Sequence, residues 1–238
     1  MCTLSWTPLP GGYALAMNRD ERPTRARGLP PARSVVRDVP VLMPTDPDAG
    51  GTWVSVNGIG LSLALLNRYG ESPRDPGATF TSRGLLIREM ACFGNPSEVE
   101  SDLKRRPLER YRPFTLVVMA RGGRPQVFDW NGLRLAGSLV RRPGLVRASS
   151  GSDQAEAERV RGGLFRTAAA EQGGLTAATL ERLHRSHFPE KGAISICMHR
   201  QEANTVSLSL ITVDENDISI FYVDGPPGEN AGGLLLQL

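Results

Sequence analysis

Cys2 and the charged run Asn18-Arg19-Asp20-Glu21 are the residues of this chain whose types and spacing are best suited to chemistry. The initiator methionine is generally removed when the second residue is small, so we expect Cys2 to become the N-terminus. A thiol attacks as its thiolate, and its unperturbed pKa is about 8.5. The α-amine on the same residue, with a pKa of about 7.7–8.0, is matched to take that proton near neutral pH. These features predict a nucleophile that carries its own base.

A hairpin is expected to bring the charged run to the thiol. CTLSWT is rich in strand-forming residues, PLPGG is a turn and YALAMN is compatible with a strand, so residues 2–18 are predicted to pair as a hairpin. With the turn centred near Pro10, the register places Cys2 opposite Asn18, give or take one residue. Directly opposed residues lie about 5 Å apart, so the start of the charged run is expected beside the nucleophile.

Two residues of the run have separate expected roles. The positive charge of Arg19 would favour the thiolate, and the carboxylate of Asp20 could hydrogen-bond and orient the α-amine. The alternative interpretation is that Arg19, Asp20, Glu21 and Arg22 form only an exposed, ion-paired corner.

A second hairpin ends in an asparagine. TWVSV and IGLSLALLN are apolar runs joined at Asn57-Gly58, which suits a type I′ turn with positive φ at both central residues. Its last residue is Asn67, which by itself is typical of a strand end. The polar connection from Glu21 to Gly50 is expected to run over the surface, with VPVLMP touching the sheet.

The remaining elements follow the order two helices, strands, two helices, strands. This order lacks the alternation of a doubly wound parallel sheet and favours antiparallel sheets flanked by helices. The spacing of Ser97 and Glu100 predicts a capping box at the start of the second helix, which Pro107 ends. The C-terminal GGLLLQL is expected to dock on the body of the protein. The helices are predicted at 81–94, 97–106, 153–172 and 176–188, and the strands at 114–120, 126–130, 133–139, 193–198, 205–213 and 218–223.

Composition restricts the function classes. The 238 residues show no linker or repeat, so one domain over 1–238 is expected. The net charge of +3 comes from dispersed arginines, whereas nucleic-acid binding needs a clustered basic surface, so no nucleic-acid partner is expected. No apolar run approaches the ~20 residues that cross a bilayer and no signal sequence is evident, so no membrane partner and a cytoplasmic location are expected. Three cysteines cannot all pair, which fits a reducing compartment.

A metal site is the weaker chemical alternative. His184-x-x-His187 and Cys197-x-His199 supply four soft ligands at a spacing compatible with zinc. The first pair lies on a predicted helix and the second on a predicted strand, where amphipathic packing and a buried thiol explain them equally well. Neither a metal nor another cofactor is therefore expected.

The opening MCT, the NRDE tetrapeptide at 18–21 and GGTWVSVNGIGLSLALLN at 50–67 resemble the NRDE family, also called the transport and Golgi organization protein family. More distantly, a Cys2 followed by an Arg/Asp pair and an apolar strand ending in Asn resembles the choloylglycine hydrolase and penicillin acylase branch of the N-terminal nucleophile hydrolases. The resemblance implies an α+β fold, a four-layer α-β-β-α sandwich of two antiparallel sheets.

The same resemblance implies an activity. Cys2 would attack the carbonyl of a non-peptide C–N bond and form a thioester, making the protein an amidohydrolase or acyltransferase for a small-molecule amide or acyl ligand. Arg19 and Asp20 would assist the nucleophile, and Asn67 would help form the oxyanion hole.

Three further positions are possible site residues. Asn18 adjoins the Arg/Asp pair, a second catalytic asparagine of the hydrolases would fall where Ser149 and Ser150 stand, and a late arginine corresponds loosely to Arg200. Since the NRDE family has been connected with haem and lipid handling, the alternative function is non-catalytic binding of haem or an acyl or lipid ligand on the same fold.

Overall fold

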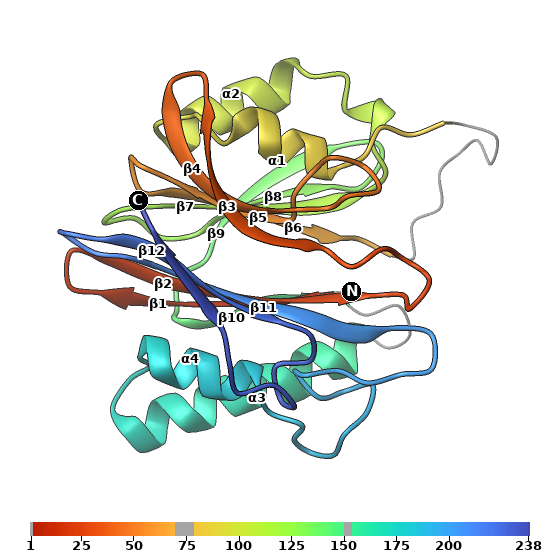
Figure 1. The fold of residues 1–238 in the computed structure, drawn as a ribbon, viewed down its shortest axis with the longest axis vertical. Coiled ribbons are helices and arrows are strands. Elements are labelled where there is room, and N and C mark those ends of the chain that lie inside the picture. Colours follow the sequence, from red (N-terminus) through yellow and green to blue (C-terminus); the bar gives the residue numbers. More distant parts are fainter. Residues whose placement is uncertain (1, 70–78, 150–153) are drawn as a thin grey trace.

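The computed structural model describes residues 2–69, 79–149 and 154–238, which form four layers (Figure 1). Two antiparallel sheets face each other, with α1 and α2 covering one and α3 and α4 covering the other. The predicted α-β-β-α sandwich is confirmed. The helices are α1 (Gly84–Met90), α2 (Pro96–Arg105), α3 (Gln154–Gln172) and α4 (Ala177–His184), with a 3-10 turn at Leu108–Arg110.

The strands divide between a six-stranded and a seven-stranded sheet. The six-stranded sheet has the order β10 (Gly144–Ser149), β1 (Cys2–Leu9), β2 (Gly12–Glu21), β11 (Asn204–Val213), β12 (Ile218–Asp224) and β13 (Leu234–Gln237). The seven-stranded sheet runs in sequence order through β3 (Leu29–Val36), β4 (Val39–Thr45), β5 (Val54–Asn57), β6 (Leu61–Asn67), β7 (Phe114–Ala120), β8 (Gln126–Trp130) and β9 (Leu135–Leu139).

Strand alternation divides the apolar residues among three interfaces. In β2, Leu15 and Met17 pack between the sheets, whereas Ala14 and Ala16 pack against the α3/α4 layer. A third apolar cluster lies between the seven-stranded sheet and the α1/α2 layer. Successive side chains point to opposite faces of a strand, so each buried strand needs apolar residues on both faces. Cys2, at the N-terminal end of β1, lies on the face of that strand that packs against the seven-stranded sheet.

The first hairpin forms as predicted, with a register one residue from the expected pair. Cys2 lies opposite Arg19, and Thr3 lies opposite Asn18. Because a shift of one residue exchanges the faces of a strand, Arg19 shares the face of Cys2 while Asn18 points to the helices. Gly11, with φ +67°, supplies the left-handed residue that the turn needs.

The second hairpin also forms, but its turn is not type I′. Of the turn residues only Gly60 has a positive φ, and the Asn57 carbonyl accepts from the Gly60 N–H at 2.9 Å. The Asn57 side chain closes the turn by accepting from the N–H groups of Ile59 and Leu61 at 3.1 and 3.0 Å. Positive φ at two consecutive central residues occurs instead at Arg37 and Asp38, between β3 and β4.

Several other predictions need correction. The connection from 21 to 50 is not only surface chain, because β3 and β4 pair as a hairpin at the edge of the seven-stranded sheet. Helix α2 is capped by Asn95, whose side chain accepts from the Glu98 N–H at 3.1 Å, and not by Ser97.

The predicted strand at 193–198 is an irregular segment, although Ser195 to Met198 are buried. Besides β3 and β4, two further strands were not predicted as such. One is β10, which pairs with β1, and the other is β13, which docks the C-terminal segment on β12 as an edge strand.

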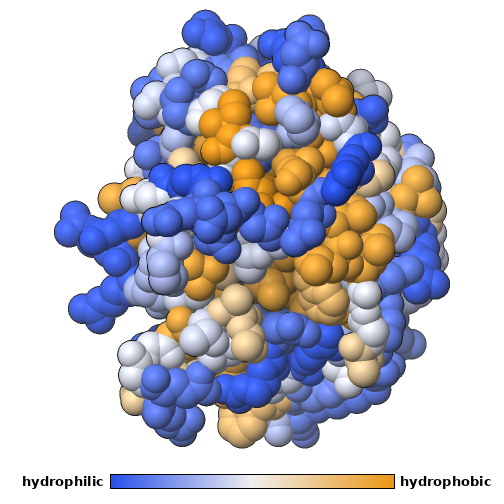
Figure 2. Space-filling model, turned by 60° about the vertical axis from the view of Figure 1, so that its left-hand side comes forward, coloured by the Kyte–Doolittle hydropathy of each residue, from blue (hydrophilic) through white to orange (hydrophobic). Residues whose placement is uncertain are grey.

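The outer surface mixes polar and apolar areas. Figure 2 shows apolar side chains gathered across the middle of one face, between more hydrophilic parts above and below. Exposed large apolar residues occur on three edge strands, β3, β9 and β13, including Val35, Leu139 and Leu235. Within the described ranges, no helix has the length and apolarity needed to span a bilayer.

Candidate active site

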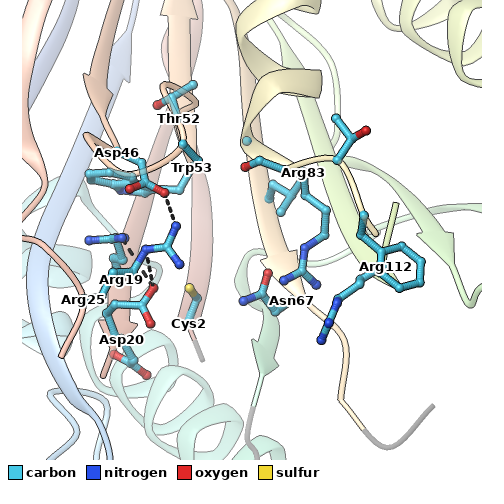
Figure 3. Close-up of a pocket in the computed structure, with 17 residues that line it drawn as sticks. Cys2, Arg19, Asp20, Arg25, Asp46, Thr52, Trp53, Asn67, Arg83 and Arg112 are labelled. Carbon is cyan, nitrogen blue, oxygen red and sulfur yellow. Dashed lines mark hydrogen bonds and ion pairs between the residues drawn. The ribbon is translucent and has the colours of Figure 1, made fainter. Parts of the chain in front are cut away.

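One cavity of about 290 Å³ collects all four residues predicted to act in catalysis. Cys2, Arg19 and Asp20 reach it from the six-stranded sheet, and Asn67 reaches it from the end of β6 in the other sheet. Figure 3 shows Asn67 across the gap from Cys2. The site therefore lies between the two sheets, at one end of the apolar core that they enclose.

The thiol of Cys2 is buried at the start of β1, between β2 and β10. Burial raises its pKa, and the charge of Asp20 adds to this effect. A backbone hydrogen bond from Asp20 and the positive charge of Arg19 oppose the increase. Because the net effect is a raised pKa, the thiol is protonated at neutral pH and needs a base before it can attack.

Arg19 is held from two sides. Its guanidinium carbon lies 4.4 Å from the centre of the Trp53 ring, and Nη2 lies 3.4 Å from Glu21 Oε2. Stacking on an aromatic face stabilises a guanidinium that is largely removed from water. The cation is therefore fixed beside Cys2, directly across the strand pair.

Asp20 is buried, and its support comes from β11. Its Oδ1 accepts from the Thr205 hydroxyl at 2.6 Å. Burial raises the pKa of Asp20, while the charge of Arg161 and the Thr205 hydrogen bond act in the opposite direction. Arg161 is itself almost fully buried and donates to Thr3 Oγ1 at 2.7 Å, so a second cation lies beneath the site.

Asn67 is tied to the strand beside Cys2. Its backbone carbonyl accepts from the Ser149 hydroxyl at 2.6 Å, and Ser149 lies opposite Cys2 in the β1–β10 pair. The Asn67 amide also contacts Tyr69 Oη at 3.3 Å. An amide with N–H donors thus faces the cavity that contains the sulfur.

Asn18 and Arg200, two of the other possible site residues, do not line this cavity. Asn18 is fully buried on the opposite face, where Nδ2 donates to the carbonyls of His184 and Ile196 at 2.9 and 3.0 Å. Arg200 lies in the segment before β11, 3.4 Å from Glu202, and does not line the cavity. Ser150 lies outside the described residues.

Sequence reasoning missed several charged residues of the cavity. Arg25 forms an ion pair with Asp46 on the wall nearest Arg19. Arg83, at the start of α1, and Arg112, just before β7, line the opposite wall. No local motif marks these arginines, because their proximity depends on how α1 and the approach to β7 pack at the cavity.

Three of the four proposed soft ligands gather in one group and do not line this cavity. His187 Nε2 lies 3.0 Å from His199 Nε2, which lies 3.8 Å from Cys197 Sγ. His184 is separate, with its ring between Ser5 Oγ and Asn18 Oδ1. Among the described residues, this is the one group of three or more such donors close enough to share an ion.

The chain resembles known proteins at two levels. Residues 1–131 match the family described as Transport and Golgi organisation 2. No curated protein matches the sequence. Among solved structures, a mutant of conjugated bile acid hydrolase from Clostridium perfringens aligns with 12% identity and a TM-score of 0.61, covering 100% of this chain and 92% of the other.

Two further structures have the same fold. Penicillin V acylase from Agrobacterium tumefaciens aligns with 10% identity and a TM-score of 0.56, over 100% of this chain and 86% of the other. A Caenorhabditis elegans ortholog of N-acylethanolamine-hydrolyzing acid amidase aligns with 12% identity and a TM-score of 0.57, over 89% and 92% of the two chains. At this identity the likeness establishes the N-terminal nucleophile hydrolase fold alone.

Proposed function

The chain belongs to the Transport and Golgi organisation 2 family, and from that premise we propose that it is an N-terminal cysteine amidohydrolase or acyltransferase acting on a non-peptide C–N bond. The observation that carries the proposal is the position of the buried Cys2 thiol. It lies in a cavity beside a fixed cation and opposite the Asn67 amide. This arrangement combines a nucleophile, a charge that favours its thiolate and a donor for a developing oxyanion.

The first half of the reaction forms a thioester. After removal of Met1, the α-amine of Cys2 takes the proton from Sγ, and the thiolate attacks the amide carbonyl. Asn67 donates to the oxygen as it gains negative charge. The C–N bond then breaks, the α-ammonium gives its proton to the leaving amine, and the acyl group remains on sulfur.

The second half releases the acyl group. Water, or an acceptor with an amine or hydroxyl group, attacks the thioester and gives its proton to the α-amine. The C–S bond breaks, and the thiolate recovers a proton. Asp20, held by Thr205, has the role of orienting the α-amine through both halves. Arg19 lowers the free energy of the thiolate each time it forms.

The fold neighbours support this choice by their names, since they are a bile acid hydrolase, an acylase and an acid amidase. The alternative, a carrier for haem or a lipid, has less support from the cavity. Ligand pockets of about 300–1,000 Å³ that hold largely apolar molecules are lined mostly by apolar side chains. This cavity has about 290 Å³ and several arginines and carboxylates on its walls.

Mass spectrometry tests the proposal directly. Protein from a host that processes initiator methionine is expected to have the mass of a chain that begins at Cys2. Incubation with a panel of amides and thioesters should add an acyl group to the first peptide, and Cys2→Ala should lose both the adduct and turnover. Cys92→Ser is the control, because it removes another thiol that does not line the cavity. Undiminished amide hydrolysis by Cys2→Ala would rule out the mechanism.

A further inference from the structure

The two walls of the cavity differ in how their charges are compensated. On the wall around Arg19, that arginine pairs with Glu21, and Arg25 pairs with Asp46. On the opposite wall, neither Arg83 nor Arg112 forms an ion pair with a carboxylate among the described residues. Arg83 Nη1 donates to the Pro113 carbonyl at 2.8 Å. Arg112 lies over the Phe80 ring, 5.2 Å from its centre.

These neutral contacts position the two side chains without cancelling their charge. Arg83 is half-buried, and burial, with a smaller effect from Arg112, lowers the pKa of its guanidinium. An arginine does not give up its proton in proteins, so two neighbouring guanidinium groups remain charged. Arg112 is exposed, whereas the charge of Arg83 is partly desolvated and is best stabilised by an anion.

The two guanidinium groups also reach toward the reacting centre. Figure 3 shows Arg83 and Arg112 extending from one wall toward the space beside Asn67. Arg83 is close enough to Cys2 for the charges of the two side chains to influence each other. One molecule can therefore place an anion between the arginines and its carbonyl between Cys2 and Asn67.

We propose that Arg83 and Arg112 form an anion subsite, so that the substrate is an amide with a carboxylate or phosphate group near the scissile bond. This inference rests on the proposed function, because it assigns a substrate class to the same cavity. Guanidinium groups bind both oxyanions through paired N–H donors, so carboxylate and phosphate share the required chemistry.

A matched series of amides tests the subsite. One arm compares N-acylglycine with N-acylglycinamide and with the N-acyl derivative of phosphoethanolamine, which vary the charge on the amine part. A second arm compares a monoamide of succinate with its neutral diamide, which varies the charge on the acyl part. In at least one arm, the parent protein is expected to favour the anionic amide by roughly 10- to 100-fold in kcat/KM, as charged hydrogen bonds suggest.

Arg83→Gln and Arg112→Gln should each remove most of that preference, chiefly by raising KM, and leave the neutral amide within about two-fold, because only the anion uses the removed charge. Arg105→Gln on α2 is the control, since it makes the same change in net charge outside the cavity. Equal losses for anionic and neutral amides in the Arg83 and Arg112 variants, or no anion preference in either arm, would overturn the subsite.

Binding separates this inference from the proposed hydrolysis. Calorimetry with Cys2→Ala should detect binding of at least one of the three anionic amides in the series. Arg83→Gln, made in the same background, should abolish that binding. If that result holds while the parent protein hydrolyses nothing, the subsite stands and the hydrolase proposal fails. If none of the three anionic amides binds to Cys2→Ala, the subsite itself is wrong.

A second inference comes from the cluster of His187, Cys197 and His199. The three donor atoms lie within 4.8 Å of one another. Zinc with bonds of about 2.0–2.1 Å to nitrogen and 2.3 Å to sulfur, at tetrahedral angles, separates its ligands by about 3.3–3.6 Å. The observed separations from His199 Nε2, 3.0 Å to His187 Nε2 and 3.8 Å to Cys197 Sγ, bracket those values.

The chain around the cluster is ordered by hydrogen bonds, not by regular secondary structure. The Cys197 N–H donates to the Ser186 carbonyl at 3.0 Å, and the His199 N–H donates to the Gly192 carbonyl at 3.0 Å. Glu229 Oε1 lies 3.8 Å from His199 Nε2 but is ion-paired with Lys191, so it is not counted as a ligand. Imidazole and thiolate are ligands that suit zinc.

This segment also supports the active site. The Met198 N–H donates to Thr205 Oγ1 at 2.8 Å, and that hydroxyl donates to Asp20 at 2.6 Å. We infer that His187, Cys197 and His199 bind zinc, with water completing the tetrahedron, and that the metal holds the segment supporting Asp20. Binding deprotonates the thiol and leaves the imidazoles neutral.

Cobalt(II) is the probe for this site. Added to metal-free parent protein, it should produce the visible bands of a tetrahedral ion and a sulfur-to-cobalt charge-transfer band, and zinc should raise the thermal midpoint. Cys197→Ser should lose the charge-transfer band, and His187→Gln should bind cobalt at least about 10-fold more weakly, as loss of a ligand implies. Cys92→Ser and Cys2→Ala are controls that remove the other thiols. A charge-transfer band that persists in Cys197→Ser, or no cobalt binding by the parent, would overturn this site.

Discussion

At the scale of the residue, the reactivity of Cys2 reflects opposing influences on one thiol. Burial raises its pKa, and Arg19 lowers it from across the strand pair. The guanidinium cannot turn away easily, because it is stacked on Trp53. Arg19 therefore favours the thiolate, while burial has the larger effect and favours the neutral thiol.

Arg19→Ala is expected to raise the pKa of Cys2, because it removes a positive charge that stabilises the thiolate. The pH profile of iodoacetamide alkylation at Cys2 should move to higher pH. Arg22→Ala makes the same change in net charge at an exposed position of the same segment and should leave the profile in place. Superimposable profiles for Arg19→Ala and the parent would show that the cation does not act on the thiol.

Asn67→Ala should lower kcat and kcat/KM together by roughly 10²–10³-fold with little change in KM, since an oxyanion donor acts mainly in the transition state. Asn67→Asp should be at least as damaging, because a carboxylate repels the oxyanion. Steady-state kinetics of folded protein measure both effects. A variant that only melts earlier and turns over normally would make Asn67 a structural strand end.

At the scale of the element, α4 is joined to the six-stranded sheet by a buried polar contact. Asn18 Nδ2 donates to two carbonyls, so its Oδ1 is an acceptor and His184 Nδ1 carries the proton. His184 Nε2 then accepts from the Ser5 hydroxyl at 2.8 Å. Burial, with a smaller effect from Arg161, lowers the pKa of His184 to about 3. Asn18 therefore anchors a helix and does not act at the cavity.

This contact predicts acid sensitivity. The unfolded chain binds a proton at His184 below a pKa of about 6.5, whereas the folded protein does not until about pH 3. Stability from this group is therefore complete above pH ~6.5 and is lost as the pH falls toward ~3. Between pH 7 and 5 the loss should be about 2 kcal/mol. Urea unfolding should show a smaller loss over that interval in His184→Gln than in the parent, and equal losses would contradict the assignment.

Helix α1 holds Arg83 at the cavity through a close backbone approach. A Cβ added to Gly51 would lie 2.6 Å from the Gly84 carbonyl carbon and 2.8 Å from Gly84 Cα. Both partners are backbone atoms at the start of α1, so the helix itself would have to move. The glycine is required here for space, and the position of Arg83 depends on it.

Gly51→Ala is expected to destabilise the protein by about 1–3 kcal/mol, the usual range for overpacking. Because it displaces α1, it should also raise KM for anionic amides more than for neutral ones. Gly58→Ala is the control, since its added Cβ would meet no atom closer than 3.6 Å. Thermal midpoints and KM values for both variants measure the effect. Normal KM values in a destabilised Gly51→Ala would separate α1 from substrate recognition.

At the scale of the whole molecule, the site exists because two sheets are packed face to face. Leu66 is buried between the sheets, next to Asn67, and Leu103 is buried between α2 and the outer face of the seven-stranded sheet. Leu66→Ala and Leu103→Ala should each cost about 2–5 kcal/mol.

Only the substitution between the sheets should also impair catalysis, because displacing catalytic groups by about 1 Å can cost 10²-fold in rate. Kinetics measured well below both melting temperatures separate activity from unfolding. Equal kcat/KM values for Leu66→Ala and Leu103→Ala would show that the packing between the sheets does not set the geometry of the site.

The sequence by itself determined the local parts of this site. Residues 2–18 predict the first hairpin, and its short turn brings Cys2 to Arg19 and Asp20 within one residue of the correct register. The apolar run that ends at Asn67 predicts its strand. Such predictions succeed because strand pairing across a tight turn depends on short-range hydrogen bonds and on the alternation of side chains.

Only the tertiary structure decided which distant residues share the cavity. A one-residue difference in register moved Asn18 to the helix layer, and Thr205 reached Asp20 through the pairing of β11 with β2. Arg83 lies at the start of α1, and Arg112 lies just before β7. Both reach the cavity because the seven-stranded sheet and its helices pack on the six-stranded sheet. Packing of one sheet on another depends on side-chain volumes contributed by the whole chain, so no local pattern carries that information.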